Sequence, residues 1–166
     1  MTTDPRTWNA GEMVTAAMLN QEIRDQLNSM FGAWTNWTPA WTAATTAPSL
    51  GNGSMTGRYM KWGRTCMVNL ELTMGSTTTY GAGVWSFSLP FIAASAVGSR
   101  VGAAHALGGA NRVAGQLVVA PAATTFTCFF PASTSVSFLS NNGATNPFTW
   151  AATHQLRASF TYETAA

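Results

Sequence analysis

Carboxylates, histidines and cysteines are the side chains with which this 166-residue chain could do chemistry. After Asp25 the sequence contains no aspartate, and its glutamates are Glu71 and Glu163. Glycoside hydrolysis usually needs two carboxylates facing a sugar, but both glutamates are expected at outward positions of strands. A Ser-His-Asp triad would lack its aspartate here, and a calcium loop would lack its acidic ligands. The sequence therefore predicts a non-enzymatic protein with no catalytic residue, no metal site and no cofactor.

The two histidines, His105 and His154, leave one alternative open. Two histidines with no acidic residue nearby make a poor metal site. In a strand, His105 would lie on the same face as Val101, Ala103 and Leu107. We therefore expect a structural residue, buried or at a subunit interface. In a trimer, three copies of His105 could instead meet on the symmetry axis and bind a metal.

The two cysteines are predicted to be small core residues. In strands of alternating pattern, Cys66 shares a face with Val68, and Cys128 shares a face with Phe126 and Phe130. A disulfide between Cys66 and Cys128 is the alternative, and no spacing pattern supports it.

Charged residues make up 8% of the chain, against about 25% in an ordinary soluble domain. We therefore expect other subunits to cover part of the surface, because a monomer with so little charge tends to associate. The basic residues of the body are spread along the sequence, whereas nucleic-acid binding needs a concentrated basic patch. No apolar run reaches the roughly 18 residues of a membrane span, and no signal peptide is visible. The sequence predicts synthesis in a cytoplasm, with neither a nucleic-acid partner nor membrane insertion.

The N-terminal segment, residues 1–34, is predicted to be an arm followed by one amphipathic helix. Thr15 is a suitable N-cap, and residues 16–31 contain neither glycine nor proline. Apolar residues follow at steps of 4, 4, 3 and 4, which is helical spacing. They are Leu19, Ile23, Leu27, Met30 and Trp34.

One heptad register places Asn20, Leu27 and Trp34 at position a, and Ile23 and Met30 at position d. A single polar residue at a, here Asn20, can fix the register and the number of strands of a coiled coil. A helix this short is marginal in water and needs a partner. We expect these residues to mediate anchoring or self-association; the alternative is that the stripe packs on the protein's own β body.

The body, residues 35–166, is predicted to consist of about eight or nine short strands. A first strand is expected at 37–42, and a hairpin turning at 62–64 precedes the alternating segment 66–74. Five further alternating segments follow between residues 84 and 139, and the last spans 154–163. Each is bounded by glycine, proline, asparagine or serine. Such a series is typical of an antiparallel β-sandwich, here jelly-roll-like, preceded by a short α-helix.

Tryptophans and basic residues provide two candidate contact surfaces. Trp34, Trp37 and Trp41 surround the junction of helix and body, where they either seal the helix against the sandwich or a subunit interface, or form a platform for sugar stacking. We expect them to seal the junction.

Arg58, Lys61 and Arg64 lie in one predicted hairpin. They are candidate surface-contact residues for an anionic surface such as a cell-wall polymer. An ordinary solvated hairpin is the alternative.

The N-terminal phrase TWNAGEMVTAAMLNQEIRDQLNSMFGAW resembles the start of many structural proteins of tailed bacteriophages, especially those infecting actinobacteria. The shared pattern is W-x-x-G-E-x-V-T-A-A-x-L-N-x-x-I-R-D-x-L. The body segments WTPAWTA, SLGNGSMTGRY, LTMGSTTTYGAGVWSFSLP and SFTYETA are similar to the β-rich C-terminal domain of the same group. The resemblance implies a non-enzymatic, trimeric structural protein whose helix anchors it and whose β domain faces outward.

Together these observations predict a virion protein: a homotrimeric minor tail or short fibre appendage. Its expected partners are its own copies, other virion proteins of the tail or capsid, and a host cell-surface glycan. A head decoration protein or head fibre is the closest alternative. A carbohydrate-binding module using exposed tryptophans is another, and a cell-wall hydrolase is disfavoured by the missing acids.

Overall fold

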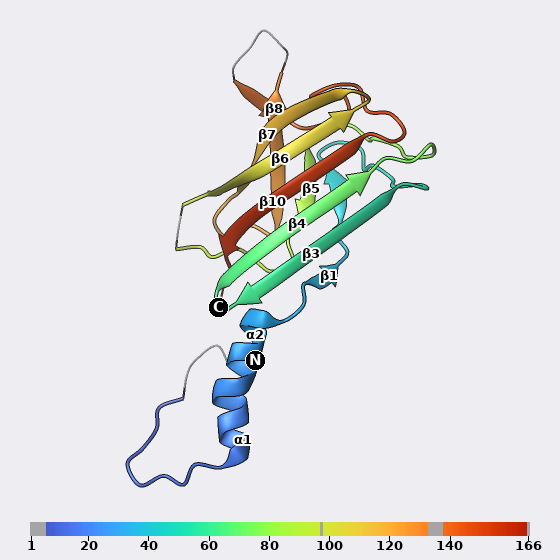
Figure 1. The fold of residues 1–166 in the computed structure, drawn as a ribbon. Helices are drawn as coiled ribbons and strands as arrows, with labels where there is room; N and C mark the ends of the chain where they lie inside the picture. The colour runs from blue at the N-terminus through green and yellow to red at the C-terminus, as the bar shows by residue number, and fades with distance from the viewer. Residues whose placement is uncertain (1–5, 97, 133–137, 166) are drawn as a thin grey trace.

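The computed structural model describes residues 6–96, 98–132 and 138–165. A helical segment comes first and is followed by the strands. It comprises α1 (Ala16–Leu19), the π-helical turn η1 (Asn20–Arg24) and α2 (Asp25–Phe31). The predicted N-cap is confirmed, because the Thr15 hydroxyl accepts a hydrogen bond of 3.2 Å from the Met18 amide. In Figure 1 this segment lies beyond the ends of the strands, next to the C-terminus.

Ten strands form the described part of the body, and they pair antiparallel. Their bounds are β1 Thr35–Trp37, β2 Trp41–Ala43, β3 Ser54–Trp62, β4 Thr65–Thr73, β5 Trp85–Ser88, β6 Arg100–Gly108, β7 Asn111–Val119, β8 Thr125–Pro131, β9 Leu139–Asn141 and β10 Gln155–Glu163. The mainly β, antiparallel class with a preceding helix is thus confirmed. The hairpin predicted to turn at 62–64 is also observed, since Trp62 pairs with Thr65 around Gly63, whose φ is +53°.

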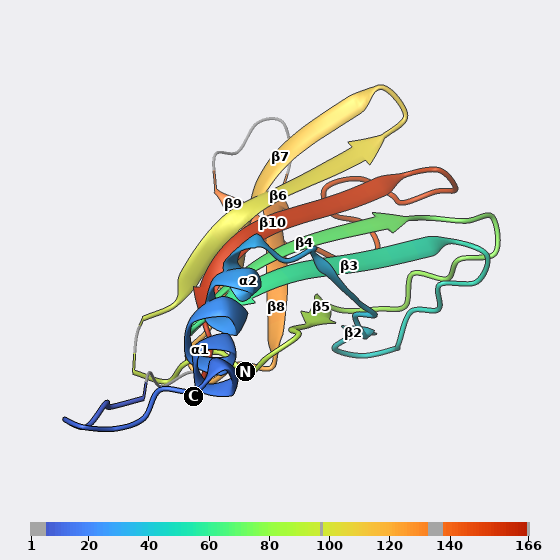
Figure 2. The same ribbon diagram turned by 60° about the horizontal axis from the view of Figure 1, so that its bottom comes forward.

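The strand order shows that the sheet must curl. The path is β1-β3-β4-β10-β6-β7-β8-β5-β2, with β9 added beside β8. Nine strands laid flat would span about 38 Å at the usual spacing. Trp37 and Trp41, on the two outermost strands, are only four residues apart, a reach of at most about 14 Å. The two edges must therefore come together, and the sheet wraps around a single interior (Figures 1 and 2).

The single first strand predicted at 37–42 is in fact two strands at opposite edges of the sheet. Trp37 in β1 pairs with Gly57 of β3, whereas Trp41 in β2 pairs with Phe87 of β5. The buried Pro39 lies between them. Proline has no amide hydrogen to donate to a sheet ladder, so the chain leaves one edge there and joins the other.

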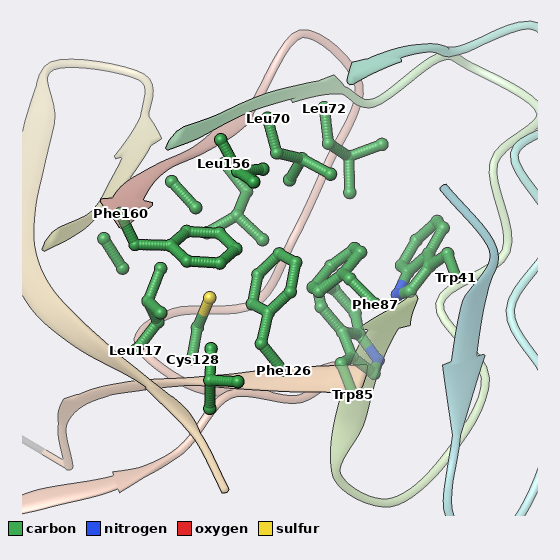
Figure 3. Close-up of a cluster of buried hydrophobic side chains, with 14 of the residues drawn as sticks. Trp41, Leu70, Leu72, Trp85, Phe87, Leu117, Phe126, Cys128, Leu156 and Phe160 are labelled. Atoms are coloured by element: carbon green, nitrogen blue, oxygen red, sulfur yellow. The ribbon is translucent and has the colours of Figure 1, made fainter. Parts of the chain in front are cut away.

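The core is aromatic and is closed by contacts across the interior. Phe126 on β8 lies 4.8 Å, between ring centroids, from Phe160 on β10, although these strands are not neighbours in the sheet. Trp41 meets Trp85 edge-on at 4.8 Å. Figure 3 shows these side chains converging from β2, β4, β5, β7, β8 and β10. The inward alternation predicted for Cys66 and for Cys128 is confirmed, because both are fully buried.

Candidate functional sites

The helical stripe is left uncovered by the rest of the described chain. Leu19, Ile23 and Leu27 are 44%, 50% and 50% exposed, and Asn20 is exposed beside them. The structure therefore does not pack these three side chains on the β body, which was the alternative to self-association. Trp34 is half-buried where the chain leaves the helix. The side chain of Met30 is not among those that the structure describes.

A π-helical turn lies within this stripe and was not foreseen. The amide of Asp25 donates to the carbonyl of Asn20, five residues earlier, where an α-helix would use a partner four residues earlier. In a regular α-helix each four-residue step drifts by about 40° around the axis. The wider turn takes more residues per turn, so Leu19, Ile23 and Leu27 fall closer to one line. The turn thus straightens the exposed stripe.

The tryptophans of the junction do not form a platform for a sugar. Trp41 is buried in the core, and the ring of Trp37 lies against Gly57, where an added Cβ would come 2.2 Å from the ring. Farther from the junction, Trp85 and Trp150 are also fully enclosed. The prediction that the junction tryptophans seal the structure is consistent with this burial.

The three basic residues of the β3–β4 hairpin point in different directions. Arg58 is exposed on the outer face of the sheet. The Lys61 Nζ lies 4.8 Å above the ring of Phe91 at the end of the body near the C-terminus. The Arg64 Nε lies 3.3 Å from an oxygen of Glu163. The hairpin therefore does not present one basic patch. Of these three residues, Arg58 alone lines a larger surface feature.

That feature is a hollow on the outer face, the outer groove, with a volume of about 420 Å³. Cross-strand pairing assembles it from two rows of residues. One row runs through Thr56, Glu71, Arg157 and His105 on β3, β4, β10 and β6. The neighbouring row runs through Arg58, Asn69, Ser159 and Ala103 on the same four strands.

Side-chain size explains the hollow. Ser159 and Ala103 are short, and each lies two residues along its strand from a longer side chain, Arg157 on β10 and His105 on β6. Arg157 is held in place, because it donates to the Gln155 side chain at 2.9 Å and its Nε lies 3.5 Å from an oxygen of Glu71. Arg58 makes no ion pair among the described residues. The outer groove therefore carries two arginines and one glutamate on a partly apolar floor, and it is open to solvent.

Sequence reasoning singled out Arg58 but not its companions in the outer groove. Glu71, His105 and Arg157 come from three other strands, and only the placement of β10 between β4 and β6 brings them together. No local pattern carries that information. His105, with Val101 and Ala103, lies on this outer face and is half-buried, while the core side of β6 is formed by Ala104 and Ala106.

The two buried thiols are unreactive at neutral pH. Cys66 and Cys128 are both free. Burial raises the pKa of the Cys66 thiol to about 11 and that of Cys128 to about 12. Because the thiolate is the reactive form, neither residue is a candidate nucleophile at neutral pH.

Within the described ranges, no group of three or more histidine, cysteine, aspartate or glutamate side chains could hold a metal ion. Among the same residues, no helix is both long and apolar enough to cross a membrane.

Comparison with known proteins gives one informative match. The chain is 34% identical over 129 residues to a protein described as the Mu-like prophage FluMu defective tail fiber protein of Haemophilus influenzae. The match covers 69% of this chain but 18% of that relative, so the chain spans less than a fifth of the relative's length. This chain is similar to part of a phage tail fibre protein. No protein-family model matches it, and no solved structure does so.

Proposed function

We propose that this chain is a non-enzymatic structural protein of a bacteriophage tail, a homotrimeric minor tail or short fibre appendage. Residues 1–34 anchor it and join the copies, and residues 35–166 form the body that is displayed. The observation that carries the proposal is the similarity to a tail fibre protein over most of the chain. The resemblance of the N-terminal phrase to tailed-phage structural proteins points the same way but does not restrict the host to actinobacteria.

The uncovered stripe supports self-association. A helix of this length is marginal by itself, and burial of Leu19, Ile23 and Leu27 against other copies would stabilise it by removing apolar surface from water. Leucine at position a with isoleucine at position d shifts coiled coils toward three or four strands. In the heptad register predicted from the sequence, Leu27 and Ile23 have this arrangement, which favours a trimer over a dimer.

The arrangement of the body supports contact with a target at its far end. The helix, the C-terminus and the β3–β4 turn lie at one end of the strands (Figure 1). Long loops at 74–84 and 142–154 lie at the other end. Loops on a rigid scaffold commonly carry binding function, and this end would face outward if the helix is anchored in the virion.

Native mass spectrometry of the full chain tests the trimer. We expect a species of three times 17.6 kDa at micromolar concentration. The triple variant L19Q/I23Q/L27Q should give a monomer, because glutamine keeps helix propensity but removes the apolar stripe. Asn28→Gln, an exposed substitution beside the stripe, is the matched control and should remain trimeric. A monomeric wild-type chain would rule out this mode of assembly.

Immunogold labelling of virions with an antibody against residues 35–166 tests the location. Label along the tail or at its tip is the expected result. Label distributed over the head would replace the proposal with a decoration protein or head fibre built on the same plan.

A further inference from the structure

We infer that the outer groove binds a saccharide unit bearing a negative charge, either a uronate or a sugar phosphate, on a bacterial surface. The inference rests on the proposed function, since an outward-facing tail protein would meet such polymers. It assigns the contact to the outer face of β3, β4, β10 and β6, a surface distinct from the loops at the end of the body.

Charge is concentrated at this groove to an unusual degree for this chain. Residues 35–166 contain eight charged residues in total: six basic and two glutamates. Three of these eight, Arg58, Glu71 and Arg157, line the outer groove, and so does His105, one of two histidines. More than a third of the body's charged residues thus lie around one hollow.

The arginines suit an anion. A guanidinium presents its donors in a planar fork that matches a carboxylate or a phosphate. Arg58 makes no ion pair among the described residues, whereas the Arg157 guanidinium is positioned by Gln155 and Glu71. Two arginines against one glutamate leave the groove with an excess positive charge.

Three of the seven remaining lining residues suit the hydroxyls of a sugar, and the other four are apolar. Asn69, Ser159 and Thr56 each bring donors and acceptors to the hollow, and all three are exposed. A volume of about 420 Å³ is within the range of small-molecule sites, roughly 300–1,000 Å³. No aromatic side chain of the described part of the chain lines it, so one site is expected to bind weakly. Three copies on one appendage would raise the effective affinity toward a polymer.

Binding of the full chain to immobilised glycans tests the inference. The probes are a glucuronate oligosaccharide and poly(glycerol phosphate), with maltohexaose as the neutral control. We expect wild-type protein to bind at least one anionic probe and not maltohexaose, and the preferred probe identifies the carboxylate or the phosphate as the ligand. Equal binding to maltohexaose would overturn the inference.

Arginine variants locate the site. Arg58→Gln and Arg157→Gln should each weaken binding about tenfold or more, because hydrogen bonds to charged groups are the strong ones. Arg112→Gln is the matched control: Arg112 is exposed on β7 and outside the outer groove. An equal loss in all three variants would mean unspecific attraction to a polyanion and would overturn the inference.

Glu71→Gln is expected to raise the affinity for the anionic probe, whereas the two arginine variants lower it. Removing this carboxylate removes repulsion of the ligand while Gln155 still positions Arg157, so affinity should rise by up to about fivefold, the scale of exposed charge interactions. A substitution that merely disturbed the sheet would lower affinity instead. A loss of binding in Glu71→Gln would therefore contradict the assigned role of the groove.

One further variant separates the groove from an interface between copies. Ser159→Cys places a thiol in the groove, and the native Cys66 and Cys128 are buried. We expect a maleimide to label Ser159→Cys in the trimer. Protection from labelling, together with no binding of anions, would show that copies cover the outer face. If neither anionic probe binds while gold labels the tail, the groove inference fails and the proposed function stands. If gold labels another part of the virion while the chain binds anions specifically, the proposed function fails and the groove inference stands.

Discussion

Trp41 and Trp85 are neighbouring core tryptophans that differ in the hydrogen bonding of their indole nitrogens. The Nε1–H of Trp85 donates to the Tyr80 carbonyl at 2.9 Å. The Nε1 of Trp41 is buried and has no hydrogen-bond partner among the residues that the structure describes. Both rings are almost completely enclosed. Trp→Phe substitution removes the same atoms at both positions. At Trp85 it removes a favourable hydrogen bond, whereas at Trp41 it removes a buried donor that makes none among the described residues.

The magnitude follows from the cost of each group. Trp85→Phe loses a hydrogen bond with a net contribution of about 0.5–1.5 kcal/mol. Trp41→Phe removes an unpartnered buried donor whose desolvation costs about 1–3 kcal/mol. The lost ring contacts and the new cavity are similar in the two variants, so their contributions nearly cancel when the two free energies of unfolding are compared. Trp85→Phe should therefore lower the free energy of unfolding by roughly 1.5–4.5 kcal/mol more than Trp41→Phe does.

Urea unfolding followed by far-ultraviolet circular dichroism measures the difference. All chains are compared at one protein concentration, because association shifts apparent stability. With a slope of about 2 kcal/mol per molar urea, the two midpoints should differ by about 0.8–2.2 M. Trp150→Phe is the control and should behave like Trp85→Phe, since its Nε1 donates to the Gly143 carbonyl at 3.0 Å. If Trp41→Phe proves as costly as the other two, the indole of Trp41 has a partner and the reasoning is refuted.

Three further predictions concern the thiols, a glycine and the helix cap. Burial raises the pKa of Cys66 and Cys128 above the unfolded value, so the folded state binds more protons than the unfolded state at alkaline pH. The free energy of unfolding should therefore be constant below about pH 9. Above that pH it should fall by up to about 1.4 kcal/mol per pH unit for each thiol. C66A/C128A should flatten that fall in urea titrations between neutral and alkaline pH, and an unchanged slope would contradict it. Gly57→Ala should lower the free energy of unfolding by about 1–3 kcal/mol, because the new Cβ meets the Trp37 ring, and an unaltered melting temperature would count against that packing. Thr15→Ala should cost the helix about 1 kcal/mol and reduce the circular dichroism signal at 222 nm, whereas an undiminished signal would show that the cap contributes nothing.

The sequence by itself determined the local features of this protein. Thr15 and the unbroken run to Phe31 predicted the helix with its start, because capping and helix propensity act within a few residues. Alternation of apolar residues predicted which side of β4 is buried, including Cys66, because a strand turns successive side chains to opposite faces. The π-helical turn was missed, since the stripe's spacing fits an unbroken α-helix equally well.

The tertiary structure alone decided the features that depend on distant pairing. The split of residues 35–43 between two edges of the sheet requires the whole strand order, and local pattern cannot reveal which strand will be the neighbour of β1 or β2. The outer groove is of the same kind: Arg58 and Arg157 are almost a hundred residues apart in the chain and share a face only because β4 lies between β3 and β10. Periodicity specifies the face to which a side chain points; the partner of each strand is fixed by burying one shared core.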